Sequence, residues 1–443
     1  MREMKDSGIA WIGEIPAYWE TPKMKYIAEN ITDFTASGSF ADLAENVKYL
    51  DYEDYAMLVR TVDLSAKRKI QHIYVNRHAY DYLKNSNLHG GELILPNIGS
   101  VGMIYKYVPL YKRSTLAPNS IMIRSQNNNY LYYLFYNTAG EEALKRLSSA
   151  TTQAKFNKTQ LRNLKVILPN LEEQQKIADF LDAKCGEIDG ILGDIEAQVE
   201  TLDAYKRSVI TEAVTKGLHP DAEMKDSGVE WIGEIPADWE TRKIKFLPNK
   251  SINSYVDGDW IESPVITDDG IPYYTTGNIG DGKFKVQGAG FISEETFIAL
   301  HCKYAYSGDL IISRLNAPYG RSCILPDFVD KCIVAVDNVI LRTDENKRYI
   351  CYVTQCSGYQ KSVEDKSSGT TMKRISRIKL GNVKIPLPPL EEQQEIADFL
   401  DAKCGEIDAL MAGKKEQAET LRAYKKSLIF EYVTGKKEVP RYE

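Results

Sequence analysis

The sequence has no apolar run that approaches the twenty residues needed to cross a bilayer. Its first residues, MREMKDSGIAWIGEIP, lack the apolar core of a secretory signal. These absences argue against a transmembrane helix and against export. We therefore expect a cytoplasmic protein without a membrane partner.

Paired cysteines and clustered histidines are missing too. The seven cysteines are odd in number and form no C-x-x-C pair, which is typical of reduced thiols and argues against a disulfide framework or a zinc site. The five histidines are scattered, and the six-residue separation of His72 and His78 is not a helical ligand spacing. We expect no bound metal.

Catalytic signatures are also absent. There is no N/D-P-P-Y/F/W motif of adenine methyltransferases, no convincing S-adenosylmethionine loop and no clear nuclease constellation. Residues 277–284, GNIGDGKF, have Walker A spacing, but Phe284 replaces the hydroxyl that would hold Mg²⁺, so a glycine-rich turn explains them better. The absences favour a binding protein. A self-contained methyltransferase or nuclease is the alternative, because motif searches miss sites assembled in three dimensions.

What the chain does contain is a repeat. Residues 171–189, LEEQQKIADFLDAKCGEID, return at residues 390–408 with one change in nineteen positions, Lys176 to Glu395. Residues 4–21, MKDSGIAWIGEIPAYWET, return at residues 224–241 with fifteen of eighteen positions identical. The chain is therefore a doubled unit of signature, variable block and helix. We expect the signature, with its glycines, proline and tryptophans, to be an irregular segment docked on a larger surface.

The two variable blocks are basic, although the chain has a net charge of −6. Residues 22–167 carry +7, residues 242–386 carry +4, and the remaining segments carry −17. Basic modules on an acidic frame are expected if only the modules face phosphates. Chance composition is the alternative, because +4 is small.

Short apolar runs between Gly, Asn and Pro predict that each block is a mixed α/β domain. The first block shows strand-like runs at residues 93–95, 102–108 and 120–124, and helical patterns at residues 130–137 and 141–148. Identity between the blocks is low, but Lys155 corresponds to Arg374, and Leu161 to Leu380, at the repeat spacing of 219. We therefore expect one fold with two different surfaces.

Each block is followed by a long helical pattern, from about residue 171 to 215 and from about residue 391 to 434. Apolar residues recur at nearly heptad spacing and define a seam at Ile188, Leu192, Ile195, Val199, Leu202, Ile407, Met411, Leu421 and Leu428. The first helix would be about 66 Å long. Gly186, Gly190 and Gly193 disfavour helix in its early middle and predict a possible break into two pieces.

A narrow apolar stripe on a long helix needs a partner. The simplest partner for each helix is the other, in an antiparallel pair with approximate two-fold symmetry; packing against other subunits is the alternative. In this pseudo-circular arrangement the N-terminal signature should lie near the end of the second helix.

Polar and basic loops in both blocks are the best candidates for contact with DNA. Arg can bridge guanine and Asn can pair with adenine, whereas hydroxyls and Lys suit phosphates; a solvated loop is the alternative for each. The candidates are Asn97, Ser100, Thr151, Thr152, Gln153, Lys155, Lys158, Thr276, Asn278, Arg314, Asn316, Tyr319, Arg321, Thr370, Thr371, Lys373, Arg374 and Arg377.

The signature, the repeated LPNLEEQQKIADFL and LPPLEEQQEIADFL segments and the alternation of helix and variable block resemble the specificity (S) subunits of bacterial type I restriction-modification enzymes. The resemblance covers the whole chain. It implies two target recognition domains that each read half of a split double-stranded DNA site, separated by an antiparallel coiled-coil spacer. It also implies two methyltransferase subunits and motor-nuclease restriction subunits as partners. S-adenosylmethionine, ATP and Mg²⁺ would be bound by those partners and not by this non-catalytic chain.

The resulting prediction is a mixed α/β fold with an internal pseudo-two-fold repeat. A signature at residues 1–21 precedes the first recognition domain at 22–167 and the central helix, linker and second signature at 168–241. The second recognition domain at 242–386 and the last helix at 387–443 follow. A degenerate, purely structural assembly scaffold without DNA specificity is the other possible function.

Overall fold

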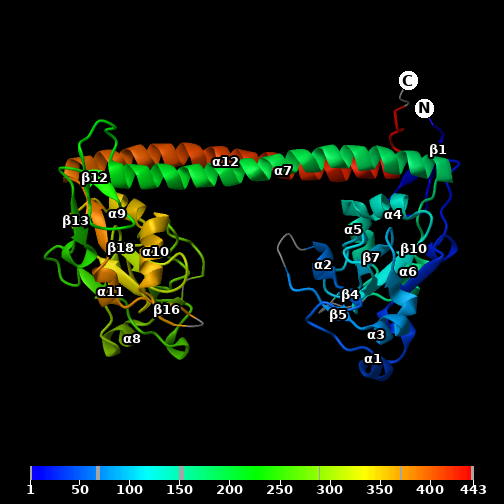
Figure 1. Ribbon diagram of the computed structural model, residues 1–443, viewed down its shortest axis with the longest axis horizontal. Coiled ribbons are helices and arrows are strands. Elements are labelled where there is room, and N and C mark those ends of the chain that lie inside the picture. Colours follow the sequence, from blue (N-terminus) through cyan, green and yellow to red (C-terminus); the bar gives the residue numbers. More distant parts are fainter. Residues whose placement is uncertain (1, 66–69, 149–153, 289, 370–371, 441–443) are drawn as a thin grey trace. The chain divides into compact units, whose positions relative to one another are not determined.

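The computed structural model describes residues 2–65, 70–148, 154–288, 290–369 and 372–440. Its contacts divide the chain into two units (Figure 1). The first unit comprises Met1–Ile195 and Glu416–Glu443, and the second comprises Glu196–Lys415. The first unit is therefore built from two separated segments, whereas the second is continuous.

Two four-stranded sheets and a hairpin form the strands of the first unit. The hairpin pairs β1 (Met4–Asp6) with β2 (Glu14–Pro16). The first sheet has the order β3 (Asn30–Asp33), β10 (Ser120–Arg124), β7 (Leu93–Pro96) and β8 (Tyr105–Lys106). The second sheet has the order β5 (Tyr74–Val75), β4 (Ala56–Val59), β9 (Ser114–Leu116) and β6 (Asn87–Leu88).

The second unit repeats this plan. Its hairpin pairs β11 (Met224–Asp226) with β12 (Glu234–Pro236), and β13 (Glu240–Lys243) pairs with β22 (Lys384–Leu387). One sheet has the order β14 (Tyr255–Asp257), β21 (Asn338–Leu341), β18 (Leu310–Ser313) and β19 (Ser322–Ile324). The other has the order β16 (Gly290–Ile292), β15 (Ile271–Tyr274), β20 (Lys331–Val334) and β17 (Ala305–Tyr306).

The strand orders of the two units correspond position by position, and each second sheet contains one parallel pair, β4 with β9 and β15 with β20. The prediction that the two blocks share one fold is confirmed. Two acidic residues, each directly before a central strand of its unit, also have equivalent roles. Glu92 pairs with Arg124 at 3.0 Å, and Asp309 pairs with Arg342 at 2.9 Å, each across a buried strand pair.

Short helices cover the sheets. Those of the first unit are α1 (Phe40–Asn46), α2 (Thr61–Ser65), α3 (Arg77–Tyr82), α4 (Asn128–Phe135), α5 (Thr138–Lys145) and α6 (Lys158–Asn163). Those of the second are α8 (Glu294–Ala299), α9 (Lys347–Val353), α10 (Ser357–Asp365) and α11 (Arg377–Gly381).

Two local predictions in the first block differ from the structure. The run at residues 102–108 provides a strand only at Tyr105–Lys106, and at its start Gly102 adopts a φ of 104°, which a regular strand excludes. Lys158, expected on a loop, is the first residue of α6. The Asn157 side chain caps this helix by accepting from the Gln160 backbone N–H at 3.0 Å. The Gln160 side chain in turn accepts from the Asn157 backbone N–H.

The long helices are α7 (Leu171–Lys216) and α12 (Leu390–Val433). Acidic side chains occupy the first turn of each, where they complement the helix dipole. Helix α7 continues through Gly186, Gly190 and Gly193 without a break. The glycines therefore do not divide the helix.

Each unit contains half of each long helix, and the halves run antiparallel. In the first unit Phe180 packs on Tyr432 with ring centroids 4.5 Å apart, and Asp189 accepts from Lys425 at 2.7 Å. In the second unit Asp408 accepts from Lys206 at 2.6 Å. Asp189 and Lys425 correspond to Asp408 and Lys206 at the repeat spacing, so one ion pair appears twice.

The seam residues face the interior of the helix pair to different degrees. Ile188, Leu192, Ile195, Ile407 and Leu428 are buried. The half-buried members are Val199, Leu202, Met411 and Leu421.

The signature docks where a long helix begins and the other ends. Trp19 is buried and donates from Nε1 to Glu173 in the first turn of α7 at 3.0 Å. Its ring also meets Tyr130 edge-on, and the Tyr130 hydroxyl donates to the Val433 carbonyl of α12 at 2.8 Å. The predicted position of the N-terminal signature near the end of the second helix is confirmed.

The second unit repeats these contacts with one difference. Trp239 donates to Glu392 at 2.8 Å, as Trp19 does to Glu173. In the first unit, however, Arg2 donates to both Glu173 and Glu438, whereas Ala222 occupies the equivalent position in the second. Burial raises the pKa of Glu392; the Trp239 hydrogen bond opposes this shift.

We predict that Gly193→Ala stabilises the chain by about 0.5–1 kcal/mol, because helix interiors disfavour glycine and a Cβ at this position meets nothing within 4 Å. Gly140→Ala in α5 is the control and should destabilise, since its Cβ would lie 2.4 Å from the Leu134 carbonyl oxygen. Thermal unfolding measures both changes. A lower midpoint for Gly193→Ala would show that the glycine is needed in the isolated chain.

We predict that Ala222→Arg stabilises the second unit by a few tenths to about 1 kcal/mol at pH 7, because it gives Glu392 the cation that Arg2 gives Glu173. A raised pKa means that the ionised Glu392 carboxylate is penalised at neutral pH and relieved below its ordinary value of 4.5. The gain should therefore fade as the pH falls through the raised pKa of Glu392. Unfolding midpoints at neutral and acidic pH test this, and an equal gain at both contradicts it.

Candidate nucleic-acid interface

Two loops that are far apart in the sequence meet in each unit. In the first unit Ile98 and Lys155 form an isolated β-bridge, and in the second Leu315 and Arg374 form the equivalent bridge. Residues 97–102 and residues 313–321 are therefore equivalent loops of the two units. The candidate loops of each unit form one surface.

Asn97 and Arg314 occupy the same position in these loops. The Asn97 side chain donates to the Phe156 carbonyl and the Arg314 guanidinium donates to the Ile375 carbonyl, both at 3.1 Å. The reverse backbone bonds, from the amides of Phe156 and Ile375, are also present. In both units a polar side chain thus joins the two loops.

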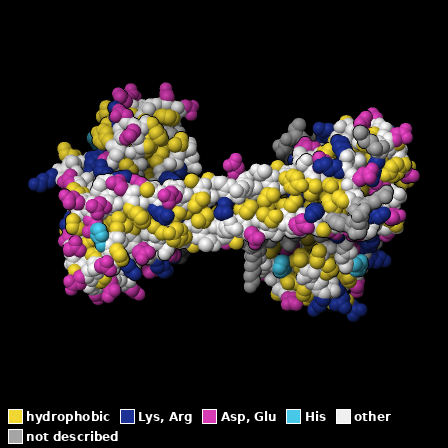
Figure 2. All heavy atoms as spheres, turned by 90° about the horizontal axis from the view of Figure 1, so that it is seen from above, with side chains coloured by type: hydrophobic (Ala, Val, Ile, Leu, Met, Phe, Trp, Pro, Cys, Tyr) yellow, Lys and Arg dark blue, Asp and Glu magenta, His cyan; other side chains and the backbone are white. Residues whose placement is uncertain are grey.

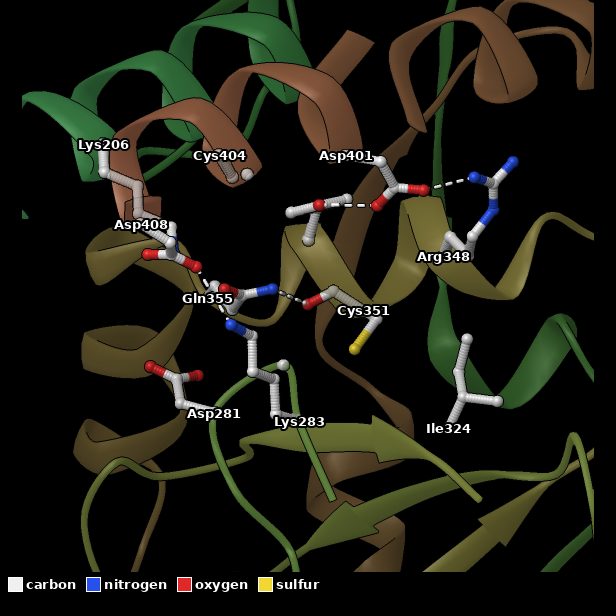
Figure 3. Close-up of a pocket in the computed structure, with 13 residues that line it drawn as sticks. Lys206, Asp281, Lys283, Ile324, Arg348, Cys351, Gln355, Asp401, Cys404 and Asp408 are labelled. Carbon is white, nitrogen blue, oxygen red and sulfur yellow. Dashed lines mark hydrogen bonds and ion pairs between the residues drawn. The ribbon is translucent and has the colours of Figure 1, made fainter. Parts of the chain in front are cut away.

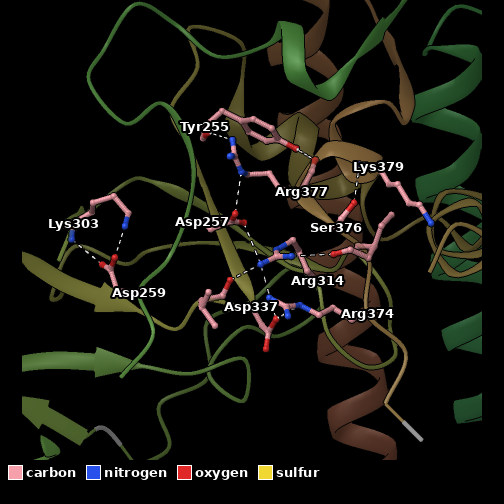
Figure 4. A network of polar contacts seen from close by, with 12 residues as sticks. Tyr255, Asp257, Asp259, Lys303, Arg314, Asp337, Arg374, Ser376, Arg377 and Lys379 are labelled. Atoms are coloured by element: carbon pink, nitrogen blue, oxygen red, sulfur yellow. Dashed lines mark hydrogen bonds and ion pairs between the residues drawn. The ribbon is translucent and has the colours of Figure 1, made fainter. Parts of the chain in front are cut away.

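Arg314 is a structural residue and not a base-reading one, which corrects our prediction. Its side chain is 4% exposed and also donates to the Val336 carbonyl at 2.5 Å. Figure 4 shows its guanidinium between Asp257, at 3.1 Å, and Asp337. Burial lowers the pKa of Arg314, and Asp257 opposes this shift. The Arg314 guanidinium bonds to groups of its own domain and is enclosed by them, so DNA cannot reach it.

Arg321 is the second correction. It is 8% exposed, and its guanidinium donates to five backbone carbonyls. The acceptors are Thr276, Ile279, Leu315, Asn316 and Pro318, at distances of 2.6–3.3 Å. Arg321 therefore joins loop 276–279 to loop 315–318 and has no face left for a base.

Asn278 is the third correction. It is 1% exposed, and its side chain donates to the carbonyls of Lys285 at 3.2 Å and Gln287 at 2.6 Å. It closes the glycine-rich turn from inside. Thr276 is half-buried at the edge of the same turn.

Most of the remaining cations already have carboxylate partners. Lys158 pairs with Asp33, Lys373 with Glu364, Arg374 with Asp337, and Arg377 with Asp257, at 2.5–3.1 Å. Lys155 is exposed and, among the described residues, has no carboxylate partner. These ion pairs hold the cations in place and reduce the positive charge presented to phosphates.

Six candidates present polar groups at the surface without being enclosed by the fold. Tyr319 is half-buried, and the exposed ones are Ser100, Lys155, Asn316, Lys373 and Arg374. Thr151, Thr152, Gln153, Thr370 and Thr371 lie outside the described residues.

Sequence reasoning missed one exposed residue beside these loops and two half-buried carboxylates. Asn119 has a φ of 66°, and its carbonyl accepts from the Asn97 amide at 3.1 Å. The preceding Pro118 made this turn recognisable, since Pro-Asn suits the centre of a type II turn. Asp257 and Asp337, by contrast, carry no sequence signal that marks them as arginine partners.

The Walker-like segment is a turn between the second domain and α12. Ile279 bridges Phe284, whose ring packs on Tyr274 with centroids 5.0 Å apart. Figure 3 shows Lys283 reaching Asp408, at 2.9 Å, which also accepts from Lys206. The lysine is committed to the helix and Phe284 has no hydroxyl, so these residues do not fit a nucleotide with its Mg²⁺.

A cavity of about 250 Å³ lies beside this contact. Asp401 borders it and accepts from Tyr352 at 2.7 Å and from Arg348. Polar side chains at the edge of the cavity therefore bond to one another, from α9 to α12. The described part of the chain holds no group of three His, Cys, Asp or Glu placed to bind a metal, and none of its helices combines the length and apolarity required to cross a membrane.

Comparison with known proteins gives a consistent result. The family model for the type I restriction modification DNA specificity domain matches residues 19–201 and 236–420. The putative type I restriction enzyme MjaX specificity subunit of Methanocaldococcus jannaschii is 28% identical over 440 residues, which cover 96% of this chain and 95% of that protein. The MjaVIII specificity subunit of the same organism is 29% identical over 329 residues, 72% of this chain and 73% of that one.

A solved structure shares the fold. It is described as "Structural basis underlying complex assembly and conformational transition of the type I R-M system" and has a TM-score of 0.67, at 17% identity, over 96% of this chain and 99% of that chain. The family model covers most of the sequence in two copies, which coincide with the two halves of the repeat. The chain belongs to the family of type I restriction modification DNA specificity domains.

Proposed function

We propose that this chain is the sequence-specific DNA-recognition subunit of a type I restriction-modification complex and has no catalytic role of its own. Residues 22–167 and 242–386 are the recognition domains, and each reads one half of a bipartite site. The observation that carries the proposal is the pair of equivalent loop surfaces. They have one backbone plan, joined by Asn97 in one unit and Arg314 in the other, but different exposed side chains.

The charge distribution supports this assignment. Both proposed recognition domains are basic on an acidic chain, and phosphate contacts supply the sequence-independent part of DNA affinity. Exposed Lys155 and the surface pair of Lys373 and Arg374 are suited to phosphates. Base discrimination comes from uncharged polar groups at the same surface.

The partners are two methyltransferase subunits, joined by motor-nuclease subunits for restriction. Figure 2 shows hydrophobic side chains on the exposed surface of the long helices. Three exposed apolar pairs recur at the repeat spacing, Leu171 with Leu390, Ile191 with Leu410, and Tyr205 with Tyr424. Surfaces repeated in this way suit two copies of one partner. S-adenosylmethionine, ATP and Mg²⁺ would act in the partner subunits, in the cytoplasm, where the DNA lies.

The long helices are the proposed spacer between the half-sites. The unbroken α7 passes from the first unit into the second, and α12 returns. A purely structural scaffold without DNA specificity is the competing function. It predicts no enrichment of any sequence when the chain binds DNA with its partners.

We predict that replacing residues 22–167 with the equivalent block of another family member changes one half-site and leaves the other intact. The two domains have separate loop surfaces, so the second should read as before. Selection of bound duplexes from a random library, with the chain in complex with its methyltransferase subunits, measures both half-sites. A change in both would contradict the two-domain model, and the absence of any preferred sequence in the unaltered chain would favour the scaffold.

We predict that deleting residues 198–204 together with residues 409–415 shortens the gap between the half-sites by about three base pairs. Each deletion removes one heptad, about 10 Å of helix, and a base pair rises about 3.4 Å. The pair Lys206–Asp408 is retained, which preserves the antiparallel register. The same selection measures the gap. Deleting only one of the two segments is the control and should destabilise the chain, whereas an unchanged gap in the matched variant would show that the helices are not the spacer.

A further inference from the structure

Asn316 occupies a position where the backbone conformation alone would be met equally well by glycine. Its φ is 60°, in the left-handed region, and its side chain is exposed. The equivalent residue of the first unit, two positions after Asn97 as Asn316 is two after Arg314, is Gly99, with a φ of 81°. Both loops thus need a left-handed residue at this point, and the first unit uses the one that adopts it without strain.

The second unit keeps a side chain there at an energetic cost. A residue other than glycine in the left-handed region is disfavoured, although asparagine tolerates it better than most. Such strain persists where the surrounding structure enforces it, and it accumulates at functional sites. Nothing in the backbone plan explains why this side chain is present.

Arg321 is the group that enforces the conformation. Its Nη1 contacts the carbonyls on both sides of the turn, Asn316 at 3.0 Å and Pro318 at 3.3 Å. The opposite edge of the same guanidinium holds Thr276 and Ile279. The turn that displays Asn316 is therefore fixed to a second loop by one buried cation.

The surroundings of Asn316 suit nucleic acid. The backbone N–H of Asn316 donates to the Lys373 carbonyl at 3.4 Å. The Lys373 ammonium lies 6.0 Å from the centre of the Tyr319 ring. Arg374 forms the isolated β-bridge with Leu315, the residue before Asn316, and its side chain is 44% exposed. The exposed Asn316 side chain thus belongs to a surface that also carries an aromatic ring and two cations, each held by a carboxylate partner.

We propose that Asn316 reads one base pair of the second half-site, and that Arg321 is the positioning residue that aims it. The ligand is the major-groove edge of adenine, because a carboxamide donates to N7 and accepts from N6 at once. This inference rests on the proposed function. It also gives a reason for the difference between the units, since Gly99 presents no side chain at the matching point.

Asn316→Gly tests the proposal, because it restores the residue that the first unit uses and leaves every Arg321 acceptor in place. Bound duplexes are selected from a random library with the full chain in complex with its methyltransferase subunits. One A·T base pair of the second half-site should lose its preference by about tenfold or more, while the first half-site and the unfolding midpoint stay unchanged or the midpoint rises. Asn253→Gly, at another left-handed asparagine of the same unit with a φ of 57°, is the matched control and should leave the selected site unchanged.

Arg321→Lys tests the positioning role. It keeps the charge but cannot reach five carbonyls, so preference at the same base pair should fall. In the Asn316→Gly background it should cause no further loss at that position, because a residue that acts through Asn316 has nothing left to position. The first half-site shows that the chain remains folded and assembled.

The outcomes separate the inference from the function beneath it. If the unaltered chain selects no sequence, the proposed function fails. If it selects a two-part site and Asn316→Gly selects the same one, Asn316 is not a reader. If Arg321→Lys weakens the preference equally with and without Asn316, or weakens both half-sites, Arg321 is not its positioning residue.

Discussion

The structure depends on a buried tryptophan that donates a hydrogen bond to a glutamate in the first turn of each long helix. Trp19 with Glu173, and Trp239 with Glu392, fix the signature to the helix. A buried indole N–H needs an acceptor, and the start of a helix favours a negative charge. The tyrosine that packs nearby, Tyr130 in the first unit and Tyr349 in the second, then donates to the end of the other long helix. Signature, domain and both helices are thereby joined at one point in each unit.

Sequence reasoning predicted this framework well, because the framework is what repeats. Apolar spacing placed the long helices, the offset of 219 matched Lys155 to Arg374, and strand β10 was found with its bounds. The loops were harder. Arg314 and Arg321 look like base-reading residues in a polar stretch. Nothing local shows that backbone carbonyls more than 40 residues away, of Ile375 for Arg314 and of Ile279 for Arg321, also accept from them. Burial arises from tertiary contacts, so a sequence identifies the cations but not which of them remain exposed for contact with DNA.

The two recognition surfaces differ in how their rigidity is achieved. The first unit uses the Asn97 amide and glycines at its turns, whereas the second uses the guanidinium groups of Arg314 and Arg321 with Asp257 and Asp337. Most guanidinium donors of Arg314 and Arg321 bond to carbonyls and half-buried carboxylates of their own domain, although Arg314 Nε has no hydrogen-bond partner among the described residues. In the second unit the cations therefore act mainly inside the domain, and specificity passes to the neutral groups that they hold in place.

The discontinuity of the first unit has a consequence for synthesis. The second unit is a single stretch, Glu196–Lys415, whereas the first is closed only by Glu416–Glu443. Domains generally fold as units while the chain emerges from the ribosome, usually the N-terminal one first. Here the second unit is complete in sequence once residue 415 has been made, before the first unit has its part of α12. A nascent chain that stops before residue 416 therefore lacks the Tyr432 and Lys425 contacts that pair α12 with α7 in the first unit.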